Sequence, residues 1–214
     1  MSTAKPIWKK SRFLNFSLTG TGKELLRKKD HFNLSKNKKR KNKLSDYGLQ
    51  LQEKQKVRFT YCMSEKQFKR FFVNAAKFKG SHGENFLKSL ESRLDRIVHL
   101  LGFAKTILQA RQLISHGHIL VDSKKVDISS YIVKPGQKIT LKEKSKKIKI
   151  VSHCLETLTN NKVDYVVLDK NSLIGSYVRY PYRNEFLTDI NEQLIKPLIH
   201  LQPLFETSIF VLQA

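Results

Sequence analysis

The chain has 214 residues, and its 41 Lys and Arg against 18 Asp and Glu give a formal net charge of +23. This length suffices for one large domain or two small ones, and so basic a chain is expected to bind a polyanion, either nucleic acid or an anionic membrane. It has no apolar run long enough to cross a bilayer, no secretory signal, and only two cysteines, Cys62 and Cys154, which lie far apart. A membrane-spanning protein, a disulfide scaffold and a cysteine-rich zinc site are therefore not expected.

Residues 1–45 form a basic arm in which Glu24 and Asp30 are the only acidic residues. Its densest run of charge, residues 36–43, repels itself and is expected to be extended in the free chain. Aromatic and leucine side chains alternate with the bases over residues 8–18, which suits an arm that becomes ordered on an RNA surface. The alternative is a solvated tail that has no partner. The cations of the run that we expect to contact RNA are Lys36, Lys38, Lys39, Arg40, Lys41 and Lys43.

Two helical patterns follow the arm. Ser45 is placed to cap the first helix. The later turns carry cations that suit the negative end of a helix dipole and are candidate RNA contacts: Lys54, Lys56 and Arg58. The second helix begins at a capping-box pattern, residues 64–67, and is expected to end near residue 80. Its apolar face is expected to be core rather than a base-stacking platform, and consists of Phe68, Phe71, Phe72, Ala75 and Ala76.

Residues 92–141 are the stretch around which the rest of the chain is organised. Apolar residues recur on one helical face between residues 87 and 101. Thr106 can cap the next helix, whose apolar residues face inward. Gly117 can end that helix, because a left-handed backbone conformation costs glycine little.

The hydrophobic period then changes from helix to strand. Residues 119–121 (Ile-Leu-Val) predict a short strand that is followed by a turn at residues 122–123. A second turn at residues 135–136 (Pro-Gly) leads into a strand over residues 138–141. We therefore expect a compact helix–helix–hairpin unit that is too small to make much core alone.

Polar side chains of this unit are expected to cluster at one edge. They come from the start of the first helix, the outer side of the second helix, and both sides of the glycine that ends it. Arginine forks match phosphate oxygens, and glutamine and histidine can bond 2′-hydroxyls and base edges. For Arg93 and Asp95 the alternative is a pair of solvated helix charges. The candidate RNA-binding residues are Arg93, Asp95, Arg111, Gln112, His116, His118 and Lys124.

The last third of the chain carries weaker patterns. A basic segment at residues 142–149 precedes a weak helical stretch around Cys154. Strands are predicted over residues 163–168 and 175–179, and Asp189 is placed to cap a final helix.

Three motifs of the central stretch resemble the small RNA-binding domain named after small-subunit ribosomal protein four. These are residues 93–95 (Arg-Leu-Asp), 110–114 (Ala-Arg-Gln-Leu-Ile) and 116–121 (His-Gly-His-Ile-Leu-Val). The same domain also occurs in RNA-modifying enzymes, a synthetase and ribosome-rescue factors, so that the flanking sequence must decide between these classes.

The flanks resemble the bacterial form of the ribosomal protein itself. The matching motifs in the helical segment are residues 47–56, 64–68 and 79–85, and those in the arm are residues 9–12 and 17–25. The resemblance implies an α+β fold whose last helix packs back onto the helical domain. Its implied parts are a basic N-terminal arm (1–45), a helical domain (46–91) completed by a C-terminal helix (about 189–200), an RNA-binding domain with further antiparallel strands (92–188, core motif 92–141), and an apolar tail (201–214).

The resemblance also implies a function. The protein is expected to be a structural constituent of the small ribosomal subunit that binds small-subunit rRNA in the 5′ domain as a primary binder, nucleates assembly, contacts small-subunit protein five and contributes to the mRNA entry site and to translational accuracy. We expect no catalysis, no cofactor, no membrane association and no homo-oligomer. Some relatives bind zinc through N-terminal cysteines; this chain has none there, so no metal is expected. The apolar tail is expected to pack on the helical domain or on a neighbouring ribosomal protein, the alternative being a frayed end.

Other readings remain open at this point. An RNA-modifying enzyme of the pseudouridine synthase type is supported by the Arg-Leu-Asp motif with Asp95, but the short chain after residue 141 leaves no room for a catalytic sheet domain. A free rescue factor is disfavoured by the long helical segment. The ribosome is expected to be cytoplasmic and bacterial, although an organelle genome could encode the same pattern.

Overall fold

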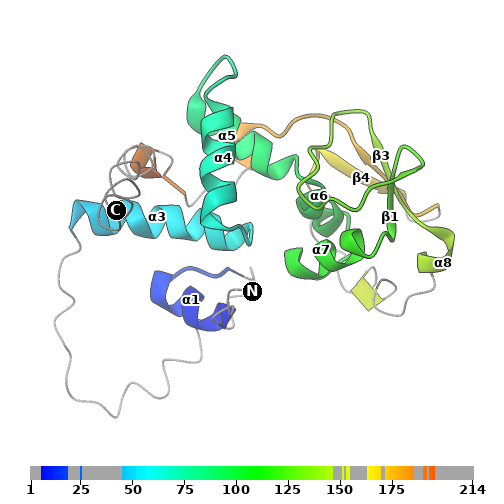
Figure 1. Ribbon diagram of the computed structural model, residues 1–214, viewed down its shortest axis with the longest axis horizontal. Helices are drawn as coiled ribbons and strands as arrows, with labels where there is room; N and C mark the ends of the chain where they lie inside the picture. Colours follow the sequence, from blue (N-terminus) through cyan, green and yellow to red (C-terminus); the bar gives the residue numbers. More distant parts are fainter. Residues whose placement is uncertain are drawn as a thin grey trace, which may run out of the picture. The chain divides into compact units, whose positions relative to one another are not determined.

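The computed structural model describes residues 6–18, 25, 45–146, 151, 153–154, 163–169, 172–185, 190–191 and 193–195 (Figure 1). Its contacts divide the chain into an N-terminal unit, residues 1–69 with 189–214, and a central unit, residues 70–188. The division falls within helix α4 (Glu65–Ala75), whereas the sequence motifs divide the chain between residues 91 and 92.

The N-terminal unit pairs α1 (Ile7–Leu14) with α3 (Asp46–Thr60). The Ser45 hydroxyl accepts a hydrogen bond from the Gly48 N–H at 3.3 Å, so the predicted cap of α3 is confirmed. Leu14 is buried, and the Lys10 ammonium lies 4.5 Å from the centre of the Phe59 ring. This part of the arm therefore folds on the protein itself, where the sequence pattern suggested ordering on RNA.

Helix α4 begins as predicted and ends early. The Ser64 hydroxyl accepts a hydrogen bond from the Gln67 N–H at 3.3 Å, as expected from the capping-box pattern. The helix stops at Ala75 rather than near residue 80, and Ala76 is exposed. The rest of the predicted apolar face does face the core: Phe68, Phe72 and Ala75 are buried, and Phe71 is half-buried.

The chain returns to the N-terminal unit at its far end. The Asn191 N–H donates to the Glu53 carboxylate of α3 at 3.3 Å, where Figure 1 draws a short orange helix beside α3. The Asn191 side chain accepts from the Gln193 N–H at 3.1 Å, which is a capping contact. Asp189, the predicted cap, lies outside the described residues, as do residues 36–43 and the tail 202–214.

The central unit begins with three helices, α5 (His82–Glu91), α6 (Leu94–Leu100) and α7 (Ile107–Ser115). The apolar face between residues 87 and 101 thus belongs to two helices, because Arg93 is extended and forms a β-bridge with Ile132. The predictions for α7 are confirmed: the Thr106 hydroxyl accepts from the Gln109 N–H at 3.2 Å, and Gly117 follows the helix with φ +72°.

The helices pack on a five-stranded antiparallel sheet of order β2-β1-β3-β5-β4, so the α+β fold is confirmed. Its strands are β1 (Ile119–Val121), β2 (Lys124–Lys125), β3 (Lys138–Leu141), β4 (Val166–Asp169) and β5 (Ile174–Tyr177). The sequence predicted all but β2, although it placed β4 and β5 up to three residues away. A four-residue helix, α8 (Glu143–Lys146), follows β3, and a 3₁₀ turn (Arg183–Glu185) follows β5.

The core of the central unit lies between the helices and one face of this sheet. Buried strand residues alternate with exposed ones, as in β3, where Ile139 and Leu141 are buried. Gly175 of β5 is required by close packing, because a Cβ there would come within 2.4 Å of the Leu101 side chain of the helix layer.

Candidate RNA-binding surface

Arg93 and Asp95 meet at the start of α6. The Arg93 Nε and Nη2 donate to the two Asp95 carboxylate oxygens at 3.0 and 2.6 Å. Both residues are only 1% exposed, so the expectation that they lie on the surface is wrong. The reason is the extended backbone at Arg93, which breaks the helix, pairs with Ile132 and places the guanidinium 5.2 Å from the centre of the Phe71 ring.

Arg111 of α7 joins the same carboxylate. Its Nε donates to Asp95 Oδ2 at 2.8 Å, and its side chain keeps 23% of its surface exposed. One buried carboxylate therefore holds two arginines, of which Arg111 reaches the surface. Gln112, the next residue, is exposed. Of the predicted residues, the structure thus brings Arg93, Asp95 and Arg111 into contact.

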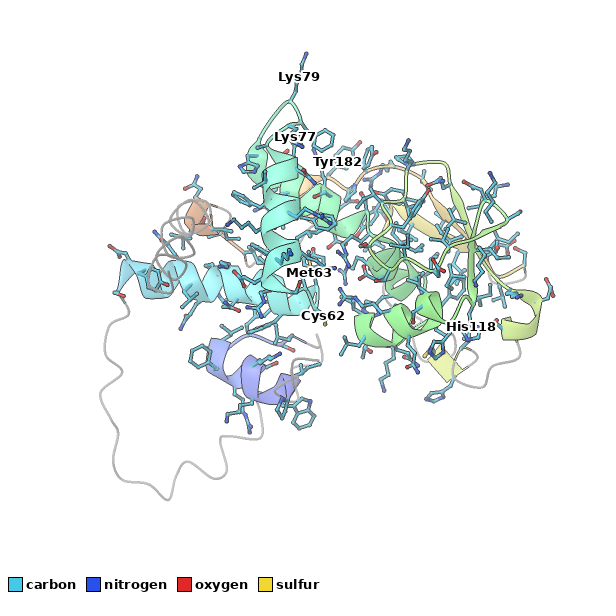
Figure 2. All side chains as sticks on the ribbon, in the orientation of Figure 1. Cys62, Met63, Lys77, Lys79, His118 and Tyr182 are labelled. Atoms are coloured by element: carbon cyan, nitrogen blue, oxygen red, sulfur yellow. The ribbon has the colours of Figure 1, made fainter. Side chains whose placement is uncertain are left out.

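A second polar group lies where α7 ends and β1 begins. His116 is exposed and His118 half-buried, and their rings lie edge to face with centroids 6.0 Å apart. The His118 Nδ1 hydrogen-bonds the Ser145 hydroxyl of α8 at 2.8 Å, and Figure 2 shows His118 between α7 and α8. Lys124 is exposed on β2.

Lys125 is a member of this second group that the sequence reading missed. Its alkyl chain crosses the backbone of Gly117, because a Cβ at that glycine would come within 2.3 Å of Lys125 Cε. Gly117 thus ends the helix and also leaves space for an exposed lysine beside the two histidines. The position of Lys125 beside Gly117 follows from its pairing with Leu120 across the sheet, and two consecutive lysines gave no pattern that would have predicted a strand.

The cations of α3 have a different role from the one predicted. Lys54 is 1% exposed and forms an ion pair with Glu65 of α4, so the expectation that it is accessible to RNA is wrong. Arg58 pairs with the same glutamate at 2.8 Å, and Lys56 pairs with Glu53 at 2.5 Å. Lys54 and Arg58 thus join α3 to the start of α4, whereas the Lys56–Glu53 pair lies within α3.

Two absences apply to the described residues alone. None of the helices described is long and apolar enough to cross a membrane. Within the same parts of the chain, no three His, Cys, Asp or Glu side chains are grouped so that they could hold a metal ion.

The basic charge, the helix–helix–sheet unit and the arginine at its edge define a nucleic-acid-binding protein. Two family models match the chain, the ribosomal protein S4/S9 N-terminal domain at residues 3–91 and the S4 domain at residues 92–139. The chain belongs to the family of the small ribosomal subunit protein uS4, and the resemblance predicted from its motifs is confirmed.

Bacterial relatives match nearly the whole chain. It is 62% identical over 189 residues to the small ribosomal subunit protein uS4 of Aster yellows witches'-broom phytoplasma, covering 88% of this chain and 93% of that protein. The corresponding protein of Phytoplasma australiense is 63% identical over 190 residues with the same coverage. That of Oceanobacillus iheyensis is 53% identical over 190 residues, covering 88% of this chain and 94% of the relative.

Proposed function

We propose that this protein is a structural constituent of the small ribosomal subunit, in which it binds small-subunit rRNA and catalyses no reaction. The proposal follows from membership of the uS4 family, whose relatives are named as small ribosomal subunit proteins. The observation that carries the mechanism is the Arg111 guanidinium, which a buried carboxylate holds at the protein surface.

The mechanism is charge neutralisation combined with recognition of RNA shape. A guanidinium already oriented by Asp95 loses little conformational entropy when it meets a phosphate. Exposed cations release the counterions condensed on the RNA, which supplies affinity that depends on salt. Gln112, His116 and His118 can add hydrogen bonds to 2′-hydroxyls and base edges.

The buried pair acts through its neighbour. Arg93 and Asp95 do not reach RNA in this proposal; they hold Arg111 in place. Lys124 and Lys125 contribute charge from β2. The basic run, residues 36–43, contributes diffuse attraction to any RNA.

Family resemblance supports the finer assignments. We place the binding site in the 5′ domain of the rRNA, where the protein acts early as a primary binder and nucleates assembly. It contacts small-subunit protein five, contributes to the mRNA entry site and affects accuracy. The named relatives are bacterial, which supports a bacterial cytoplasmic ribosome over an organellar one.

The burial of Asp95 weighs against the pseudouridine synthase alternative. A catalytic aspartate must touch the reacting base, whereas both oxygens of this buried carboxylate accept hydrogen bonds from Arg93, and one of them also accepts from Arg111. The motif that supported an enzyme therefore has a structural explanation.

The test is binding of full-length Arg111→Ala and Arg111→Lys proteins to small-subunit rRNA at several salt concentrations. Arg111→Ala should weaken binding by about 1–3 kcal/mol and reduce discrimination against unrelated structured RNA. Arg111→Lys keeps the charge but loses the planar fork, so it should keep the salt dependence and lose discrimination. If Arg111→Ala bound and discriminated like the wild type, the RNA contact would lie elsewhere.

A further inference from the structure

The loop between α4 and α5 presents one aromatic ring to solvent. Phe78, three residues after the end of α4, is 65% exposed, whereas Phe68 and Phe72 of that helix are buried. The chain leaves that helix in a tight turn, in which the Phe78 N–H donates to the Ala75 carbonyl at 3.3 Å. Phe78 therefore lies in a turn, although the sequence pattern predicted that the helix would continue to about residue 80.

The backbone of the loop is held in place. The Asn85 side-chain amide of α5 donates to the carbonyls of both Phe78 and Lys79 at 3.2 Å. The His82 ring bonds the Phe72 carbonyl at 2.8 Å, which joins the start of α5 to α4. Because the loop is already ordered, a ligand at the ring loses little affinity to ordering the chain.

The loop also carries positive charge on both sides of Phe78 in the sequence. Lys77 and Lys79 flank it in sequence and are exposed, and Figure 2 shows Lys79 extending from the tip of the loop with Lys77 beside it. Arg70 and Asn74 are exposed on α4, and the Lys77 N–H donates to the Asn74 carbonyl at 3.1 Å in the turn that follows the helix. Residues 70–83 contain no Asp or Glu.

We propose that this loop is an RNA-binding site in which Phe78 stacks on an unpaired base of small-subunit rRNA and Lys77 and Lys79 neutralise the adjacent phosphates. Aromatic rings interleaved with cations bind single-stranded nucleotides in this way, because every base has a stackable face. An apolar pocket of a protein partner would have to accommodate two unpaired cations beside the ring, which favours the polyanion. The site rests on the proposed rRNA binding but not on the role of Arg111.

The first test compares Phe78→Leu with a matched control, Tyr47→Leu. Tyr47 is 59% exposed but lies beside Asp46 at the start of α3. With full-length small-subunit rRNA as the probe, Phe78→Leu should weaken binding roughly 5- to 150-fold, the range found for loss of one stacked base. It should leave the salt dependence unchanged, because no charge is removed. Lys77→Ala and Lys79→Ala should each lower the salt slope by about 0.7–0.9. Tyr47→Leu should bind like the wild type.

The second test uses fluorescence. Trp8 is the only tryptophan of the chain, so a Trp8→Phe/Phe78→Trp protein reports on the loop alone. Its affinity should match that of Trp8→Phe, and its emission should be quenched when rRNA is added, since tryptophan stacks as phenylalanine does. Thermal unfolding should be unchanged in Phe78→Leu, because the ring is exposed.

Several outcomes would overturn the site. Unchanged rRNA binding by Phe78→Leu, or unquenched tryptophan in the bound complex, would exclude stacking. Normal binding to naked rRNA with poor retention on assembled subunits would assign the loop to a protein neighbour instead. A binding defect in Phe78→Leu with none in Arg111→Ala would refute the Arg111 contact and support the Phe78 site. A binding defect in Arg111→Ala with none in Phe78→Leu would support the Arg111 contact and refute the Phe78 site.

Discussion

At the residue scale, the buried Asp95 carboxylate has a structural role, because it binds both Arg93 and Arg111. The Asp95 carboxylate is the only acidic group among the three, and the Arg93 Nη1 is buried with no hydrogen-bond partner among the described residues. Removing the carboxylate would therefore leave an uncompensated charge in the interior, where an ion costs far more than it does in water.

We predict that Asp95→Ala lowers the free energy of unfolding by about 3–5 kcal/mol, the range for breaking a buried ion pair on one side. Asp95→Asn should cost less, because its amide oxygen can still accept a hydrogen bond. Urea unfolding of the full-length protein measures both. Asp127→Ala, which removes an exposed carboxylate from the same unit, is the control and should have little effect. Equal stability of Asp95→Ala and wild type would refute the account of this cluster.

Asp122, in the turn between β1 and β2, links a single residue to pH. Its carboxylate accepts from the Lys138 N–H at 2.9 Å and from the Gln137 side chain at 2.7 Å, and these bonds hold its pKa below the usual carboxyl value. A lowered pKa in the folded state means that the carboxylate stabilises the fold above its ordinary pKa. That stabilisation is lost as the pH falls through the lowered value.

We expect Asp122→Asn to remove this pH-dependent contribution. The asparagine keeps a side chain that tolerates the left-handed backbone of the turn, where φ is +48°. Thermal unfolding midpoints of wild type and Asp122→Asn should differ near neutral pH and converge in acid. A difference of constant size down to the lowest pH would show that titration of Asp122 does not contribute.

At the element scale, the junction of α7 and β1 combines a helix end with a binding group. Gly117 adopts φ +72°, and its bare backbone lies under the Lys125 side chain. Gly117 therefore positions Lys125, although Gly117 itself does not contact RNA in our proposal.

Gly117→Ala should affect stability and binding in separable ways. The left-handed backbone should cost about 1–2 kcal/mol of stability once a Cβ is present. The methyl group should also displace Lys125, so that rRNA affinity falls about as far as in Lys125→Ala. Binding titrations of the two variants, well below their unfolding temperatures, provide the comparison. Normal affinity in Gly117→Ala would mean that Lys125 reaches the RNA from another position or does not reach it.

At the scale of the whole molecule, the predicted RNA contacts come from a packed helix and from a run rich in basic residues in the arm. The central unit presents Arg111 from a packed helix, whereas residues 36–43 concentrate cations in an arm expected to be extended. Neutralising the six cations of this run should weaken binding to cognate and unrelated RNA together and lower the salt slope by several units. Titrations over a range of salt concentrations test this. Loss of discrimination on neutralising the run, with none in Arg111→Ala, would reverse the assigned roles.

Much of the fold could be predicted from contiguous residues. The caps at Ser45, Ser64 and Thr106 are confirmed, and so is the strand β1. Such features could be predicted because a cap or a repeating apolar face depends on only a few neighbouring residues. The same holds for the RNA-binding class, which the resemblance of contiguous motifs to a known RNA-binding domain implied. Several helix and strand ends differ from the predicted ones, as at the end of α4, because an end depends on tertiary contacts as well as on local sequence.

Only the tertiary structure decided which charged residues reach solvent. Arg93 turns inward because its backbone bridges Ile132, and Lys54 is buried because Glu65 of the next helix meets it. Sequence patterns gave no sign of either partner, since the pairing depends on how distant segments pack. The sequence by itself therefore determined the class of protein and most of its helices and strands. The packing of those elements determined that Asp95 supports Arg111 from the interior and that Phe78 is exposed between two lysines.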